Sequence, residues 1–481
     1  MTASLHAYSP PRAAARRALG AAVLMALSAC STVPPYRTPT APVPETFKEA
    51  SANWAPATPA DGFDRGPWWE VFGDPVLNRL AEQVQLSNQN IAESVAAYQQ
   101  AQAALRQERT GLFPAVRMTG SGSRSGGEGA SRDRTSTQAA LAVDWAPDLW
   151  GRLAGSISSA QASAQASEAD LASARLSAAG ALVSAYFQLR EADAEIALLI
   201  ATVEGYERNL QIARNRFTAG VVAETDVLQA RTQLVNAQAD LASTRQSRAR
   251  LEHALAVLTG QAPAGLAVVP EPVWSAPVPS VPAVVPSTLL QRRPDIAAAE
   301  RAVAAANAQI GVQRSAYFPS ISLGASLGTG GGNLADLLRA STSVWSLGLS
   351  VAQTVFDAGA TEARVQEAEA VRDARVARYR QTVLEAFQGV EDQLVALRTL
   401  QAQEPLRREA VVAADRTAQQ LLNRYRAGQV SYSEVVVAQA SALSAQRALL
   451  QLQVNRQLAT VALVQAMGGG WQLPWQGGPA R

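Results

Sequence analysis

The sequence predicts a mainly α-helical chain whose few β-strands form a membrane β-barrel only when further copies of the chain join them. Three observations lead to this fold class: long segments with heptad patterning, about four short segments of alternating polarity, and a repeat of the whole arrangement. No apolar run of about eighteen residues follows the N-terminal segment, so we expect no transmembrane helix.

The N-terminus predicts export and lipidation. Three arginines precede an apolar run from Leu19 to Leu27, in the order of a secretory signal. The run ends in "LSAC", which resembles a bacterial lipobox. We therefore expect residues 1–29 to be a signal peptide and Cys30, the only cysteine, to carry a covalent lipid. The alternative is an ordinary cleavage site beside a chance cysteine.

The charge and the side-chain inventory argue against several function classes. Removal of the signal leaves 39 basic and 40 acidic residues, so no nucleic-acid partner is expected. His253 is then the only histidine. Neither a thiol–imidazole pair nor a multi-histidine metal site can be assembled within one chain, and we expect no enzyme and no cofactor other than the lipid on Cys30.

A linker and a capped helix follow the signal. Residues 30–67 are rich in Pro, Ala, Ser and Thr and predict an extended, lipidated tether. Trp68 and Trp69 come next, and packing is the favoured interpretation of both. Asp74 and Pro75 suit the cap and first turn of a helix expected over residues 75–111.

Segments of alternating polarity predict the strands. In the first half, Ala139, Leu141, Val143 and Trp145 alternate with small or polar residues. In the second half the same alternation covers residues 321–327 and 345–351.

Each strand pair is followed by a very long helix and a shorter one. In the first half these are expected over residues 152–217 and 223–258, with apolar residues seven apart from Leu182 to Phe217. At about 1.5 Å per residue the long helix reaches roughly 100 Å, so it belongs in solvent beside other helices. In the second half Pro405 interrupts the heptads, and we expect it to kink or break the helix.

The two halves are copies of one another. "RNRFTAGVVAETDV" (Arg214 to Val227) matches "LNRYRAGQVSYSEV" (Leu422 to Val435) at a spacing of 208 residues. The expected organisation is a first repeat at 68–260, a connector at 261–293, a second repeat at 294–467 and a tail at 468–481.

The small number of strands predicts an oligomer. In lipid every backbone polar group must be paired, which leaves a closed barrel for a chain without a transmembrane helix. About four strands cannot close a barrel wide enough for water, since even eight barely leave interior space. Several chains must therefore share one barrel.

These features together resemble the lipoprotein branch of the TolC-like outer-membrane efflux factors. The resemblance rests on the element order, the duplicated "FP" and "AG" motifs, "RRPDIAAAER" (Arg292 to Arg301), the lipobox and the closing "GGGW". It implies a homotrimer with a twelve-stranded barrel in the outer membrane, anchored by lipid and extended through the periplasm by helices. A periplasmic adaptor (membrane fusion) protein and an inner-membrane pump are the implied partners.

The resemblance also implies residue roles at the hairpin ends. Thr225, Asp226 and Tyr425 match residues that hold a periplasmic gate closed, and Glu434 matches an acidic ring around the pore. The alternative for Asp226 and Glu434 is that they are helix-start acids favoured by the helix dipole. Two members of the implied gate are replaced, an arginine by Val430 and a second ring acid by Val437.

The turns themselves have an implied partner. Gly220 and Gly428 permit the positive φ of a tight helix reversal. Together with Ala219 and Ala427 they match the turns where adaptor tips dock.

The function that this implies is an exit duct for drugs and other small toxic molecules in a tripartite efflux pump. The alternatives are the outer-membrane duct of a type I secretion or metal export system, a lipid-anchored coiled-coil structural protein and, more remotely, a periplasmic lipoprotein enzyme.

Overall fold

The computed structural model describes residues 32–49, 66–126, 134–273, 278–279, 293–333, 339 and 343–469. The expected signal peptide, Cys30, Arg292 and most of the expected tail lie outside these ranges. No helix in the described ranges is both long and apolar enough to cross a membrane. The elements are η1 Trp68–Phe72, α2 Pro75–Ser87, α3 Gln89–Thr110, β1 Ala115–Ser125, β2 Arg134–Trp145, α4 Arg152–Thr218, α5 Glu224–Leu258, η2 Pro263–Gly265, α7 Pro294–Arg314, η3 Ser315–Tyr317, β3 Ser320–Gly331, β4 Ser343–Ala352, α8 Ala360–Arg426 and α9 Tyr432–Ala466.

The chain divides into two compact units, and each draws on both sequence repeats. The first comprises Met1–Thr40, Ala97–Glu168 and Ala298–Tyr379, and contains all four strands. The second comprises Ala41–Ala96, Ala169–Ala297 and Arg380–Arg481, and contains α2, α5 and α9 whole. The long helices α4 and α8 contribute to both units.

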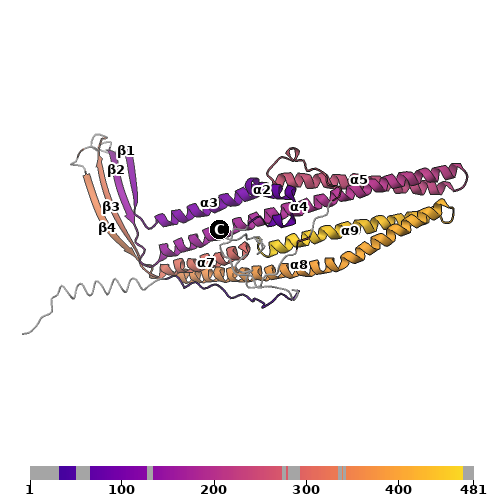
Figure 1. Ribbon diagram of the computed structural model, residues 1–481. Coiled ribbons are helices and arrows are strands. Elements are labelled where there is room, and N and C mark those ends of the chain that lie inside the picture. Colours follow the sequence, from indigo (N-terminus) through magenta and orange to yellow (C-terminus); the bar gives the residue numbers. More distant parts are fainter. Residues whose placement is uncertain are drawn as a thin grey trace, which may run out of the picture. The chain divides into compact units, whose positions relative to one another are not determined.

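The four strands form one antiparallel sheet in the order β1-β2-β3-β4 (Figure 1). The register aligns the apolar residues of neighbouring strands on one face, because directly paired residues point the same way. Met118 pairs with Leu141, Leu141 with Leu327, and Leu327 with Trp345. The predicted alternation is therefore confirmed, and β2–β3 pairing joins the two repeats within one sheet.

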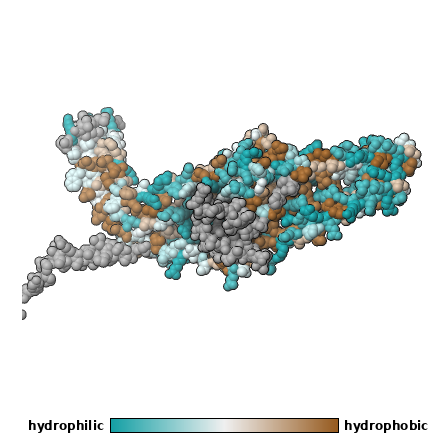
Figure 2. Space-filling model, in the orientation of Figure 1, coloured by the Kyte–Doolittle hydropathy of each residue, from teal (hydrophilic) through white to brown (hydrophobic). Residues whose placement is uncertain are grey.

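The apolar face of this sheet is exposed to solvent in the isolated chain. Met118 is 82% exposed, Trp345 76% and Leu347 74%. Figure 2 shows hydrophobic side chains over the visible side of the sheet. Among the described residues, β1 and β4 each pair with one strand only. A sheet of this kind lacks both a cover for its apolar face and partners for its two edges.

The second unit is built on two helical hairpins, one of α4 with α5 and one of α8 with α9 (Figure 1). The long helices have 67 residues each, and the predicted bounds agree with α4 and α5 to within one residue. Pro405 does not break α8, which runs through it without interruption. Next to the proline, the Glu404 carboxylate pairs with Arg408 on the same helix and with Arg456 on α9.

The helix expected over residues 75–111 is interrupted, and the expectation of one helix was wrong. Asn88 separates α2 from α3 with an extended backbone conformation. Its Oδ1 accepts from the backbone N–H groups of Asn90 and Ile91, and its Nδ2 donates to the carbonyl of Leu258 at 2.8 Å. The Asn88 side chain caps the start of α3 and is held by a contact with the end of α5, so the helix is interrupted here despite the helix propensity of the flanking residues.

The aromatic segment before α2 packs as expected. Trp68, Trp69 and Phe72 are buried, and the Phe72 ring lies 4.9 Å from that of Phe187. Asp74 caps α2 by accepting from the backbone N–H groups of Val76 and Leu77.

The described part of the linker is extended, but it is held in place along the helices. In the first unit, Thr32 Oγ1 donates to the carbonyls of Trp150 at 2.8 Å and Gly311 at 3.0 Å. A Cβ at Gly311 would lie 2.5 Å from a Val33 methyl group, so the glycine permits this close approach. In the second unit, the Glu49 carboxylate pairs with Arg398.

A buried charged cluster joins α4 to α5 within the second unit. Asp193 of α4 is 3% exposed and accepts from Arg248 of α5 at 2.7 Å and from Arg190 at 3.0 Å. Arg190 is 2% exposed and also donates to the Val269 carbonyl at 2.8 Å. The backbone N–H of Glu271 donates to the second Asp193 oxygen at 3.2 Å. The cluster therefore fixes the start of the segment after α5 as well as the two helices.

Candidate functional site at the tips of the helical hairpins

The two hairpin turns have the same backbone geometry. Gly220 has φ 71° and Gly428 has φ 75°, the left-handed conformation that glycine adopts without strain. In each turn the glycine N–H donates to the carbonyl three residues earlier, at 2.8 Å to Phe217 and 2.9 Å to Tyr425. Ala219, Gly220, Ala427 and Gly428 are all exposed. The predicted turns are thus present and accessible, and docking of a partner on them stays a prediction.

Tyr425 and Asp226 come together although they lie 199 residues apart in the sequence. Tyr425 is in the last turn of α8, and its hydroxyl donates to Asp226 Oδ2 at 3.1 Å. Asp226 is in the first turn of α5, where its charge also suits the helix dipole. This hydrogen bond joins the tip of the second hairpin to the tip of the first.

Arg216, which was not predicted as a site residue, makes a second connection between the tips. It lies in the last turn of α4, and its guanidinium donates to the carbonyls of Tyr425 and, at 3.2 Å, of Arg426 at the end of α8. The same guanidinium lies 4.7 Å from the centre of the Tyr425 ring. Arg216 thus caps the end of α8 and also makes a cation–π contact with the Tyr425 ring. A basic residue in the last helical turn was the only sequence signal, and it is too common to identify a site.

An apolar core supports these polar contacts. Tyr425 is 2% exposed and its ring lies 5.0 Å from that of Tyr432 in a cluster with Leu210, Ala213 and Val435. Burial, and then the neighbouring Asp226 carboxylate, raise the pKa of Tyr425 to about 12. The phenol therefore keeps its proton and remains a hydrogen-bond donor at physiological pH.

The other predicted gate residues lie outside this contact. Thr225 is exposed at the start of α5. Glu434 is exposed, and its carboxylate accepts from the backbone N–H of Ser431 at 3.1 Å, as in a capping box. Glu434 thus acts locally as a helix-start acid, the alternative considered for it. Val430 packs against the apolar cluster, and Val437 is 69% exposed.

The arrangement can hold the two hairpin tips together reversibly. A phenol–carboxylate hydrogen bond is charge-assisted and contributes about 1.5 to 3 kcal/mol when shielded from water. The tip contains the turns, the Tyr425–Asp226 hydrogen bond (the first latch) and the contacts of Arg216, and these contacts can form or break as the tips meet or separate. The site is therefore suited to a conformational role.

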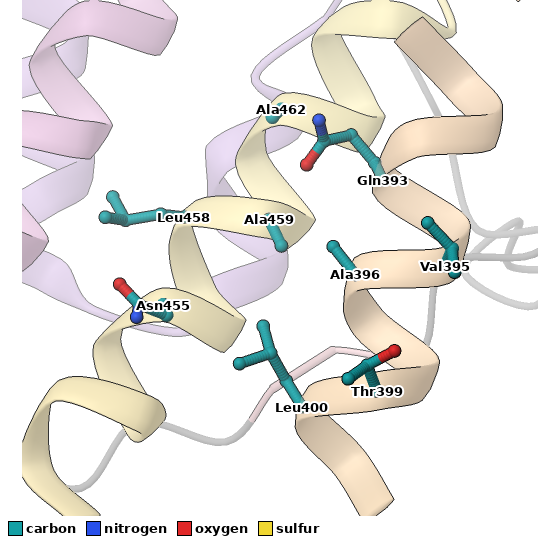
Figure 3. Close-up of a pocket in the computed structure, with 9 residues that line it drawn as sticks. All are labelled: Gln393, Val395, Ala396, Thr399, Leu400, Asn455, Leu458, Ala459 and Ala462. Atoms are coloured by element: carbon teal, nitrogen blue, oxygen red, sulfur yellow. The ribbon is translucent and has the colours of Figure 1, made fainter. Parts of the chain in front are cut away.

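A cavity of about 570 Å³ lies between α8 and α9, away from the tips. Figure 3 shows its lining side chains, with Gln393 extending from α8 toward Ala462 of α9. Most of the lining is apolar, including Val395, Leu400 and Leu458, and none of the lining residues is charged. We regard this cavity as a gap in helix packing and assign it no ligand.

Known proteins resemble this chain in both sequence and structure. A family model described as outer membrane efflux protein matches residues 80–261 and 285–469. The chain is 32% identical to the probable efflux pump outer membrane protein TtgC of Pseudomonas putida, over 92% of this chain and 93% of that protein. It is 29% identical to the cation efflux system protein CusC of Escherichia coli, over 94% of this chain and 98% of that protein.

Solved structures give the same result. The outer-membrane channel OprN superposes with a TM-score of 0.81 at 32% identity, covering 92% of this chain and 99% of that one. The open state of the MtrE outer membrane channel of Neisseria gonorrhoeae superposes with a TM-score of 0.77 at 27% identity, covering 92% and 98%.

Proposed function

Because the chain belongs to the outer membrane efflux protein family, we propose that it forms the homotrimeric exit duct of a tripartite pump that exports small toxic molecules. Its place is the outer membrane, with the long helices extending into the periplasm. The TtgC protein of another Pseudomonas putida strain is described as a toluene efflux pump outer membrane protein and CusC as a cation efflux system protein, so an organic solvent and cations are both represented among relatives of similar coverage. Cargo selection then lies with the inner-membrane pump.

The observation that carries this proposal is the incomplete sheet. Its apolar face is exposed and its outer strands β1 and β4 each have one partner in the described chain. Pairing of β4 with β1 of the next copy supplies both missing partners, and three copies of the four-stranded sheet give twelve strands in one closed barrel. Lipid then covers the apolar face. Twelve strands leave an interior wide enough for water and solutes.

The hairpin tips are then the gate of this duct. In the proposed closed state Tyr425 and Asp226 join the second hairpin to the first, and the hairpins separate when the duct opens. Thr225 and Glu434 belong to the same gate as residues near the pore axis, where three Glu434 carboxylates would attract cations. The related MtrE channel was solved in an open state, which supports a duct with more than one state.

The exposed turns are the proposed docking site for the periplasmic adaptor protein, which links the duct to the inner-membrane pump. Phe217 and Val221 flank the first turn and are 46% and 62% exposed, so the tip offers apolar contact area next to Ala219 and Gly220.

We expect Ala219→Glu combined with Ala427→Glu to reduce copurification of the adaptor from cell membranes, because each substitution places a charge in the contact. Both residues are exposed and lie in the turns directly after α4 and α8, so folding is expected to be unaffected. The matched control is Ala103→Glu, at an exposed position on α3 that is distant in sequence from both turns. Equal adaptor recovery from the double variant and the wild type would contradict the docking assignment.

Conductance tests the duct itself. The purified protein is expected to migrate as a heat-resistant trimer in detergent and to conduct ions in a planar lipid bilayer. The mass of the same preparation tests the proposed lipid: Cys30 should be the first residue and carry acyl chains, whereas Cys30→Ser should lack them. If the protein is a monomer, and neither the wild type nor Tyr425→Phe conducts ions, the proposal is wrong and a lipid-anchored structural protein is favoured.

A further inference from the structure

One arginine of the second hairpin reaches out to both helices of the first. Arg447 of α9 donates from Nη2 to Asp240 Oδ2 of α5 at 3.1 Å. Its Nε lies 2.9 Å from Glu195 Oε1 of α4, as an ion pair in which the N–H does not point at the carboxylate. The Arg447 guanidinium thus connects α9 to both helices of the other hairpin.

The neighbouring contacts of α9 stay within its own hairpin. Gln446 donates to Asp415 of α8 at 2.9 Å, and Arg456 pairs with Glu404 of α8. Arg456 has a counterpart in the first hairpin, 208 residues earlier, where Arg248 of α5 pairs with Asp193 of α4. Arg248 and Arg456 each pair with an acid on the long helix of their own hairpin, so both copies contain an arginine–carboxylate pair of this kind.

The pair between the hairpins is not repeated. At the same spacing, Arg447 corresponds to Ala239, and Asp240 corresponds to Ala448. Among the described residues, each chain therefore makes this contact once, between α9 and the first hairpin. Because the contact is absent from the equivalent positions, it did not arise from duplication of the hairpin. A contact that connects the two different hairpins accounts for it.

The surroundings allow this contact to break. A cavity of about 290 Å³ lies beside it, lined by Tyr206, Asn236 and Asp240 of the first hairpin and by Ser444 and Arg447 of the second. The side chains of Arg447 and Asp240 are 33% and 48% exposed, so water reaches both charges after separation. On α4, burial and then the charge of Glu195 raise the pKa of Glu191 to about 7.

We propose that Arg447, with Asp240 and Glu195, forms a second latch that holds the two hairpins together and is released when the duct opens. This proposal rests on the proposed function of a gated duct. The second latch lies along the helices, away from the tips. It therefore restrains the hairpins at a different position along their length from the Tyr425–Asp226 contact. Opening then requires both latches to separate in each chain.

Removal of the second latch should shift the duct toward its open state. For a half-exposed ion pair we expect the ratio of open to closed states to rise about 1.5- to 5-fold per chain. Arg447→Gln and Asp240→Asn should both give this rise in planar-bilayer conductance. The double variant should conduct no more than the stronger single variant, because both substitutions remove one contact.

The matched control is Arg456→Gln, which removes an ion pair of the same helix within the second hairpin. It should lower the thermal midpoint of the trimer and leave conductance at the wild-type value. If Tyr425→Phe raises conductance but Arg447→Gln and Asp240→Asn do not, the second latch is wrong and the duct stands. An equal rise in Arg456→Gln would also overturn it, because any loosened helix would then have the same effect.

Discussion

Replacement of Tyr425 by Phe, or of Asp226 by Ala, is expected to raise the conductance of the reconstituted duct more than any other single change. Tyr425→Phe removes only the hydroxyl that donates to Asp226 and keeps the ring on Tyr432 and under Arg216. A shielded bond of this kind contributes about 1.5 to 3 kcal/mol, which corresponds to a roughly ten- to hundredfold shift toward the open state per chain. The measurement is single-channel conductance in a planar bilayer at fixed voltage and salt.

Tyr98→Phe provides the matched control for this prediction. Its hydroxyl accepts from Gln102 at 3.0 Å within the same helix, so its loss leaves the contact between hairpins intact. We expect this variant to conduct as the wild type does. Unchanged conductance in both Tyr425→Phe and Asp226→Ala would remove the latch assignment, whatever the behaviour of Tyr98→Phe.

The helical reversals and the sheet could be predicted because local sequence determines them. The positive φ of each tight turn requires a glycine, here Gly220 and Gly428. The alternation of apolar and small residues predicts the strands. The repeat then turned two local patterns into one architecture. Tyr425 and Asp226 could be proposed as partners by resemblance, but only the structure places their side chains 3.1 Å apart.

The remaining features depend on contacts between distant parts of the chain. Asn88 ends α2 with support from the carbonyl of Leu258, which lies 170 residues away. Arg216 finds its partners 209 and 210 residues away, and Arg447 finds Asp240 at a separation of 207. Arginines on long, solvated helices are common, and their sequence positions do not reveal which of them cross to another hairpin.

The position of Val430 illustrates how a departure from a family pattern can be accommodated. The resemblance implied an arginine there, yet Val430 packs into the apolar cluster beneath Tyr425. Arg216, in the last turn of α4 on the other hairpin, places its guanidinium against the ring and the carbonyl of the same tyrosine. The tips therefore combine an apolar core with the Arg216 guanidinium, which would give the proposed gate a charged contact without the implied residue.

The largest expected effect on stability comes from Asp193→Ala. Asp193 is the shared acceptor for Arg190 and Arg248, and its removal leaves Arg190 buried, at 2% exposure, with only the longer 3.5 Å pair to the half-exposed Glu271 carboxylate. Breaking a buried ion pair in this way costs about 3 to 5 kcal/mol, because the remaining charge has lost its buried partner. It also frees the backbone N–H of Glu271 and loosens the segment that follows α5.

The measurement is the guanidinium midpoint of unfolding, followed by circular dichroism of the α-helices, with Asp415→Ala as the matched control. Asp415 also joins two helices of one hairpin, but it accepts from the neutral Gln446 and is only partly buried, so its loss should cost about 1 kcal/mol. Asp193→Asn should fall between the two, because the amide oxygen still accepts one hydrogen bond while the charge is lost. If Asp193→Ala shifts the midpoint no further than Asp415→Ala, the cluster is solvated in solution and does not hold α4, α5 and the following segment together.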